Sequence, residues 1–130
     1  MTDSVDTLIL FAHGARDPLW RLPADALAER LRGQLPDARI DVAFLEFMQP
    51  TLPEAIDAAV AAGARRVSIA PLFWAEGGHL RREVPELIAD CQARHPDLEI
   101  DRWPVLGDSA EVLEALSEVY GRRWRMAGAA

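Results

Sequence analysis

The sequence of 130 residues has a single cysteine and no run of apolar residues long enough to cross a membrane. One cysteine cannot form an intrachain disulfide or supply the thiolates of an iron–sulfur cluster, so we expect no such cluster and a reducing, cytoplasmic location. A membrane-spanning helix needs roughly 20 consecutive apolar residues. The first residues, MTDSVD, are acidic and lack the basic segment of a secretory signal. We therefore expect no membrane association and no export.

Basic residues are also few, since 14 Lys and Arg against 21 Asp and Glu give a net charge of −7. This charge argues against nucleic acid as a partner, because nucleic-acid binding depends on cations that face phosphates. The sequence has no GxxxxGK phosphate loop, and its GGH stretch does not open a dinucleotide-binding motif. We therefore expect no nucleotide cofactor.

The chain does contain enough apolar sequence for one core, because half of its residues are hydrophobic. Its length is typical of one domain, which we expect to span residues 1–130 with flexible ends at 1–5 and 126–130. Stretches rich in Ile, Val, Leu and Phe predict four strands: Thr7–Ala12, Arg39–Leu45, Arg66–Phe73 and Leu98–Trp103. Apolar residues at helical spacing predict helices around residues 24–35, 52–60 and 84–91, and from about Ser109 to Arg125.

This alternation of strand and helix predicts an α/β fold with a four-stranded parallel sheet. The first strand contains LILFA, which is apolar throughout, as expected for a strand covered on both faces. The second begins with polar alternation and the fourth, LEIDRW, carries three charges, so both are expected at the edges of the sheet. The predicted strand order is therefore 2-1-3-4, a flavodoxin-like doubly wound sheet with helices on both faces.

Two of the three histidines follow predicted strands. His13 comes directly after the first strand, and His79 follows the third after a short loop with two glycines. Because the winding reverses between these strands, a ligand crevice is expected at their carboxyl ends, and Glu46 ends the second strand at the same edge. Imidazole binds divalent iron, cobalt or nickel and accepts protons near neutral pH. His13 and His79 are therefore candidate metal ligands and catalytic residues.

Six further residues are expected around this edge and are candidates for ligand binding: Gly14, Gly77, Gly78, Arg16, Arg81 and Arg82. The glycines would let the backbone turn tightly and approach a flat ligand closely. The arginines either form a solvated face or act as counterions for a carboxylated ligand. In the second case the local positive potential matters more than the negative net charge.

Several other residues have a structural and a functional interpretation. Glu46 is either a solvated strand end or a residue that binds metal, orients a histidine or relays protons. Glu83, one helical turn beyond His79, is either part of the site or a first-turn acid that interacts with the helix dipole. His95 and Cys91 are expected outside the site, the first on the surface at a helix end and the second in the core.

Four stretches, in order and at matching spacing, resemble the small CbiX-type sirohydrochlorin chelatases: LILFAHGARDPLW, VAFLEFMQPTLPEAI, VSIAPLFWAEGGHLRREVPEL and PVLG. These proteins are similar to the SirB proteins and belong to the class II tetrapyrrole chelatases, and the resemblance extends to about Gly107. The two active-site histidines of the family fall on His13 and His79, and the acid of its FLE stretch falls on Glu46. The acid after GGH falls on Glu83. The family's HGSRD pattern has Ala15 in place of serine here.

The resemblance implies insertion of Co²⁺ or Fe²⁺ into sirohydrochlorin, on the route to cobalamin or sirohaem, and some small relatives handle Ni²⁺. It also implies a homodimer, because larger relatives hold two such halves in one chain. One alternative is a metal or tetrapyrrole carrier without turnover. Another is a phosphatase with His13 as nucleophile, but such enzymes need an arginine before the histidine, and Ala12 stands there. A purely structural domain is the last alternative.

Overall fold

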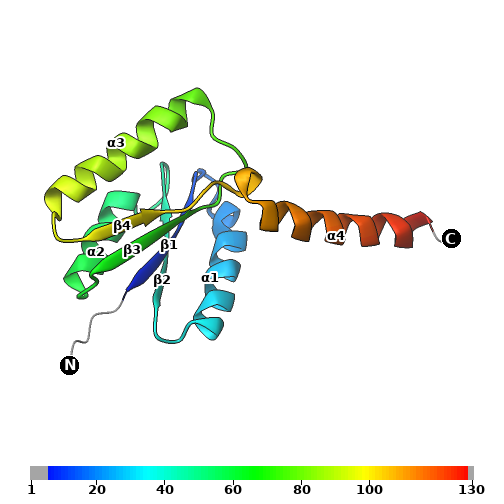
Figure 1. Ribbon diagram of the computed structural model, residues 1–130, viewed down its shortest axis with the longest axis horizontal. Coiled ribbons are helices and arrows are strands. Elements are labelled where there is room, and N and C mark those ends of the chain that lie inside the picture. Colours follow the sequence, from blue (N-terminus) through cyan, green and yellow to red (C-terminus); the bar gives the residue numbers. More distant parts are fainter. Residues whose placement is uncertain (1–5, 129–130) are drawn as a thin grey trace.

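The computed structural model describes residues 6–128, which form one parallel sheet with helices around it (Figure 1). The strands are β1 (Thr7–Ala12), β2 (Arg39–Phe44), β3 (Arg66–Pro71) and β4 (Glu99–Arg102). Their order is β2-β1-β3-β4 and all neighbours are parallel, which confirms the predicted topology. Three strands end one or two residues earlier than predicted. Beyond them the backbone keeps single hydrogen bonds, such as Leu72 N to Phe11 O at 2.8 Å, before it turns into loops.

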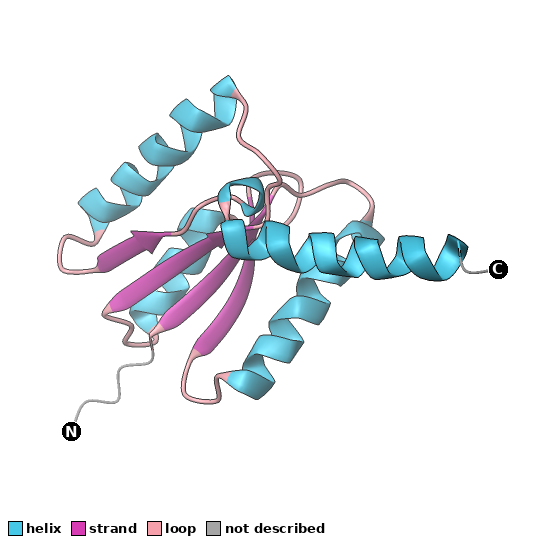
Figure 2. Ribbon diagram, turned by 45° about the vertical axis from the view of Figure 1, so that its right-hand side comes forward, coloured by secondary structure: helices cyan, strands magenta, loops and turns pink. Residues whose placement is uncertain are grey.

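Helices cover both faces of the sheet, as predicted (Figure 2). They are α1 (Leu22–Gln34), α2 (Leu52–Ala61), α3 (Gly78–Arg94) and α4 (Ala110–Gly128), with short 3₁₀ turns η1 (Pro18–Arg21) and η2 (Leu106–Asp108). Alternation along β1 divides the core: Ile9 and Phe11 pack in the cluster that contains α2 and α3, whereas Leu8 and Leu10 pack with α1. The central strand is buried along its whole length, which explains its unbroken apolar sequence.

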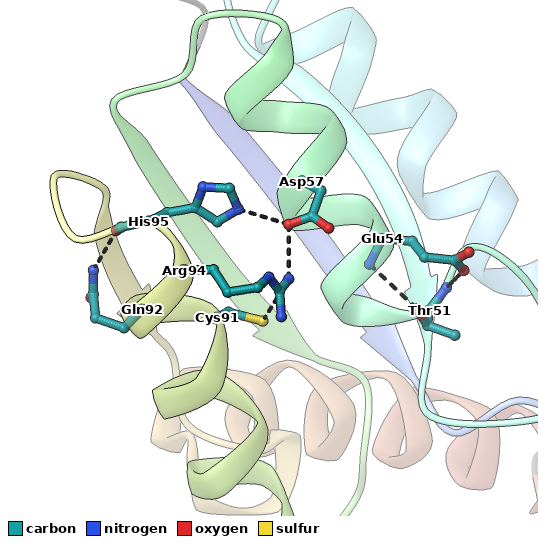
Figure 3. Close-up of polar contacts among 7 residues, drawn as sticks. All are labelled: Thr51, Glu54, Asp57, Cys91, Gln92, Arg94 and His95. Carbon is teal, nitrogen blue, oxygen red and sulfur yellow. Dashed lines mark hydrogen bonds and ion pairs between the residues drawn. The ribbon is translucent and has the colours of Figure 1, made fainter.

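Local interactions set both ends of α2, which was predicted around residues 52–60. The Thr51 side chain accepts a hydrogen bond from Glu54 N at 3.3 Å, and Glu54 Oε1 accepts one from Thr51 N at 2.8 Å, which is a capping box (Figure 3). Gly63, just beyond the helix, has φ of 97°, a left-handed conformation that favours glycine. These caps fix the length of the connection between β2 and β3.

A cluster of ion pairs joins α2 to the end of α3 (Figure 3). Asp57 Oδ1 lies 2.8 Å from Arg94 Nη2 and 2.7 Å from His95 Nε2. The hydrogen bond from Arg94, and then that from His95, holds the pKa of the Asp57 carboxyl below its ordinary value of 3.8. His95 is therefore a helix-joining residue. Cys91 beside it is fully buried, as predicted, and burial raises the pKa of its thiol.

The last helix departs from expectation in two ways. It continues to Gly128, so residues 126–128, which we expected to be flexible, are helical, while 1–5 and 129–130 lie outside the described residues. It also projects from the rest of the domain, and none of its residues is buried (Figure 1). No helix among residues 6–128 is both long and apolar enough to span a bilayer.

The ion pairs of Asp57 predict a specific pH dependence of stability. Because the pKa of Asp57 is lowered on folding, its carboxylate stabilises the protein above the unfolded pKa, and this contribution is lost as the pH falls through the folded pKa. Asp57→Asn should therefore lower the urea midpoint at pH 6, and the difference from wild type should shrink as the pH falls below 4.

Unfolding curves at several pH values test this prediction, with Asp37→Asn as the matched control. Asp37 is exposed and forms no ion pair within residues 6–128. A constant difference between Asp57→Asn and wild type from pH 6 to pH 3 would contradict the assignment.

Candidate active site at the carboxyl edge of the sheet

The pairing of β1 with β2 continues past the strand ends and sets the first part of the site. Leu45 N donates to Ala12 O at 2.9 Å, and Glu46 N donates to His13 O at 3.0 Å. These bonds hold His13 and Glu46 side by side, with His13 Nε2 3.3 Å from Glu46 Oε2. The sequence predicted both residues at this edge, and the backbone register explains why they meet.

Gly14 is the residue that allows this close approach. Its φ is 96°, and a Cβ built at this position would lie 1.8 Å from the carbonyl oxygen of Glu46. Any side chain would therefore push the segment that carries Glu46 away from His13. The predicted need for glycine holds here, and the backbone of Glu46 is what approaches it.

Gly77 and Gly78 differ from Gly14. Neither has a left-handed φ, and a Cβ added to either would meet no atom within 4 Å. The fold of this chain therefore does not require glycine at these positions, in contrast to the tight turn that the sequence predicted. Their effect is to leave exposed backbone at the start of α3, next to His79.

The His13 ring is supported on one side and open on the other. Phe73, a buried residue just after β3, contacts the ring edge-on with centroids 6.4 Å apart, and Phe73 itself packs against Phe11. His13 Nδ1 lies 3.3 Å from Gly14 O, and 47% of the His13 side chain is exposed. A neutral imidazole donates from one nitrogen only, so either Nδ1 donates to Gly14 O or Nε2 donates to Glu46.

The second histidine lies in the first turn of α3. His79 Nε2 is 2.6 Å from Glu83 Oε2, one helical turn further along the chain. Glu83 is therefore a direct partner of His79, and its role in a site stays a prediction. The His79 side chain is 85% exposed, far more than that of His13. This pair depends on local helix geometry, whereas the His13–Glu46 pair depends on the sheet.

The loop between β3 and α3 is tied to β4 by an ion pair that sequence reasoning missed. Both carboxylate oxygens of Glu76 accept hydrogen bonds from Arg102 Nη2, at 2.8 and 3.0 Å, and the Glu76 side chain is only 15% exposed. Gly107 N also donates to Trp74 O at 2.8 Å. The sequence does show an acid, Glu76, inside a glycine-containing loop. The spacing of residues along the chain could not show that its partner, Arg102, lies on the edge strand β4.

Cationic and exposed aromatic side chains lie in the same segments of the chain as the two histidine–glutamate pairs. The guanidinium of Arg16 lies 5.0 Å from the centroid of the Phe47 ring. Phe47 has φ of 67° and is 55% exposed, a conformation that the sequence analysis did not predict. Arg81 and Arg82 are exposed, and within residues 6–128 neither side chain forms an ion pair. All three predicted arginines are thus accessible to a ligand.

The structure brings the predicted residues together as two separate pairs. Each histidine contacts its own glutamate, and no group of three metal-binding side chains forms within the described part of the chain. A joint role for His13 and His79 therefore remains a prediction. Together, the parallel α/β fold and the segments that follow β1, β2 and β3 define a domain with exposed imidazoles, carboxylates and arginines.

Comparison with known proteins identifies the family. The CbiX family model matches residues 7–122, and the chain belongs to this family. The resemblance inferred from the four sequence stretches is thereby confirmed. A crystal structure described as a CbiX protein of cobalamin biosynthesis, from Marinobacter aquaeolei VT8, matches with a TM-score of 0.80 at 27% identity, covering 93% of this chain and 98% of that one.

Two curated relatives carry activity names. A sirohydrochlorin cobaltochelatase from Methanococcus aeolicus is 29% identical over 90 residues, which are 68% of this chain and 63% of that protein. A sirohydrochlorin ferrochelatase from Priestia megaterium is 28% identical over 116 residues, 89% of this chain and 44% of that protein. The chain thus spans less than two thirds of the length of each.

The geometry at Gly14 predicts a sharp difference between two glycine substitutions. Gly14→Ala should destabilise the protein by at least about 1–3 kcal/mol, the usual cost of a strained backbone, because the new Cβ also meets Glu46 O. Gly78→Ala, in open space at the start of α3, should leave stability unchanged or slightly raised. Urea unfolding of both variants measures this, and equal effects would mean that Gly14 does not hold the turn.

Proposed function

We propose that this protein is a sirohydrochlorin chelatase, which inserts Co²⁺ or Fe²⁺ into the macrocycle in cobalamin or sirohaem biosynthesis. The observation that carries the proposal is the presence of two imidazole–carboxylate pairs at one edge of the sheet, in a chain of the CbiX family. The names of the two curated relatives support this substrate. Both ions are first-row metals that imidazole nitrogen binds well, as is Ni²⁺, whereas Mg²⁺ prefers oxygen.

Metal insertion requires that two pyrrole N–H groups lose their protons and that the metal loses water. The number of pairs matches the number of protons. Each imidazole can take one proton, and the adjacent carboxylate, Glu46 or Glu83, then stabilises the imidazolium. In the neutral tautomer that donates from Nδ1 to Gly14 O, His13 Nε2 offers a lone pair to the incoming metal. The metal and the macrocycle are both substrates, and two protons are the by-product.

The remaining residues bind the macrocycle. Arg16, Arg81 and Arg82 pair with its peripheral carboxylates, since guanidinium and carboxylate form strong charge-assisted hydrogen bonds. The exposed backbone of Gly77 and Gly78 leaves room for the flat ring. Trp74 and Phe47, which are 57% and 55% exposed, offer apolar surface to it.

A second copy of the chain is part of this proposal. His79 is 85% exposed, so one domain holds a ligand from one side only. The chain spans 44% of the ferrochelatase relative, which also supports a second half in the working enzyme. A homodimer, with the partner closing the cleft, satisfies both observations. The cytoplasmic location and the lack of a nucleotide cofactor remain predictions.

A carrier without turnover is the second candidate, and the exposure of both pairs favours it. Neither pair has a third protein ligand within residues 6–128. A metal held by few protein ligands is easily passed on, which suits a carrier as well as an enzyme. Only an enzyme, however, accelerates insertion over the spontaneous reaction.

Substitution of the two rim histidines tests the proposed reaction. Anaerobic absorbance of sirohydrochlorin with Co²⁺ or Fe²⁺ should show accelerated insertion by the wild type. His13→Ala and His79→Ala should each slow it by about 10²–10⁴-fold, the usual contribution of a general base. His95→Ala is the matched control, because His95 bonds to Asp57 away from this edge. Near-wild-type rates in His79→Ala would overturn the assignment, and binding without acceleration would establish the carrier.

Substitution of the arginines tests macrocycle binding separately. Arg81→Gln and Arg82→Gln should each raise KM for sirohydrochlorin about tenfold with little change in kcat, because a lost charge-assisted hydrogen bond costs about 1.5 kcal/mol. Arg66→Gln, at the opposite end of β3, provides the control. If KM is unchanged in both rim variants, these arginines do not hold the substrate.

A further inference from the structure

The side chain of Glu76 turns inward from a loop that is otherwise exposed. Its neighbours Trp74, Ala75 and Gly77 are exposed, whereas the Glu76 side chain is mostly buried. Both of its carboxylate oxygens accept hydrogen bonds from one nitrogen, Nη2 of Arg102, at 2.8 and 3.0 Å. Charged side chains are rarely buried unless they are paired, so this contact is what keeps Glu76 turned inward.

The partner of Glu76 comes from the edge of the sheet. Arg102 is the last residue of β4, the edge strand next to β3. It pairs in register with Ile69 of β3, whose side chain lies in the core cluster that contains α2 and α3. Paired residues of neighbouring strands project from the same face of a sheet, so Arg102 projects toward the face that α3 covers. The ion pair therefore joins the loop after β3 to the strand beside it.

Backbone hydrogen bonds hold the first part of this loop and stop before Glu76. The carbonyl oxygens of Phe73 and Trp74 accept hydrogen bonds from backbone N–H groups of η2, at 2.9 and 2.8 Å. Within residues 6–128, no backbone hydrogen bond holds Ala75 or Glu76. The side chain of Glu76 is therefore the last tether of the loop before α3 begins.

His79 lies just beyond this tether, and its own contacts do not fix its place relative to the sheet. Its partner Glu83 belongs to the same helix, so the contact between them moves with α3. Further along the helix, Leu80 is only partly buried, and the first buried residue is Val84. The position of His79 therefore depends on Glu76 on one side and on the packing of α3 on the other.

We propose that the Glu76–Arg102 ion pair positions His79 for metal insertion, as a pair of positioning residues that do not touch the substrates. The catalytic part of this inference rests on the proposed chelatase reaction. Proton transfer needs a base within hydrogen-bond reach, and a displacement of about 1 Å can slow a reaction about 10²-fold. Arg81 and Arg82, on the same turn, have long flexible side chains that can follow such a displacement. Loss of the ion pair should therefore lower kcat more than it raises KM.

Neutral variants of the ion pair test this role in steady-state insertion of Co²⁺ into sirohydrochlorin. Glu76→Gln and Arg102→Gln should each lower kcat about 10–100-fold, with a smaller change in KM. The double variant should lose no more than either single variant, because both substitutions remove one contact. Arg102→Lys, which keeps a charged nitrogen donor, should recover part of the rate. Wild-type rates in both single variants, or losses that multiply in the double variant, would overturn the proposal.

The ion pair of Asp41 provides the matched control. Asp41 Oδ2 lies 2.7 Å from Arg39 Nε, in a pair of similar burial on β2, the opposite edge strand. Asp41→Asn should lower the urea midpoint about as much as Glu76→Gln does, and it should leave kcat unchanged. If Asp41→Asn slowed insertion equally, loss of stability would explain both results and the positioning role would be wrong.

Hydrogen exchange separates this inference from the proposed reaction. Residues 81–84 donate their amides within the first turns of α3. Without metal or macrocycle, these amides should exchange faster in Glu76→Gln than in the wild type, and Asp41→Asn should not change them. A wild type that does not accelerate insertion would refute the chelatase and leave this measurement intact. Equal exchange in Glu76→Gln and the wild type would overturn the positioning role even in an active enzyme.

Discussion

The placement of β1 between β2 and β3 is the constraint on which the rest of the structure depends. This strand is buried along its length and pairs in parallel with both neighbours, so three carboxyl ends meet at one edge. The hydrogen bonds that continue past β1 bring Glu46 to His13, and Phe73 arrives from β3 to support the His13 ring. Gly14 permits this convergence, because no side chain fits between its backbone and that of Glu46. Core packing and the candidate active site therefore have the same origin.

The two histidine–glutamate pairs contain the same chemical groups but are held in place by different parts of the structure. The His13–Glu46 pair is held by sheet register and aromatic packing, so it is set by the tertiary fold. The His79–Glu83 pair needs only one helical turn, and its histidine is almost fully exposed. The proposed reaction, which must both meet a hydrated metal and position it, would benefit from this difference. The exposed histidine is suited to the first contact, and the supported histidine is suited to fixed geometry.

The strand order could be predicted from the sequence because a strand buried on both faces is apolar throughout, whereas an edge strand carries charged residues. LILFA, which is apolar throughout, was expected at the centre, and LEIDRW, which carries three charges, at an edge, and from these the order was predicted. His13, Glu46 and His79 could be proposed as site residues because the ends of the strands before them are visible in the sequence. The supports of the site were not found, since the Glu76–Arg102 ion pair and the Phe73 contact join elements whose distance only the folded chain sets. The periodicity of α4 predicted an amphipathic helix, but periodicity does not say what the apolar side meets.

One domain is incomplete in two respects, and they are physically connected. The candidate active site is open on one side, and the apolar side of α4 has no cover within residues 6–128. The turn at the base of α4 is bonded to the backbone of Phe73 and Trp74, in the loop that leads to His79. A shift of the base of α4 would therefore be transmitted to the loop that leads to His79, and so to the second histidine–glutamate pair.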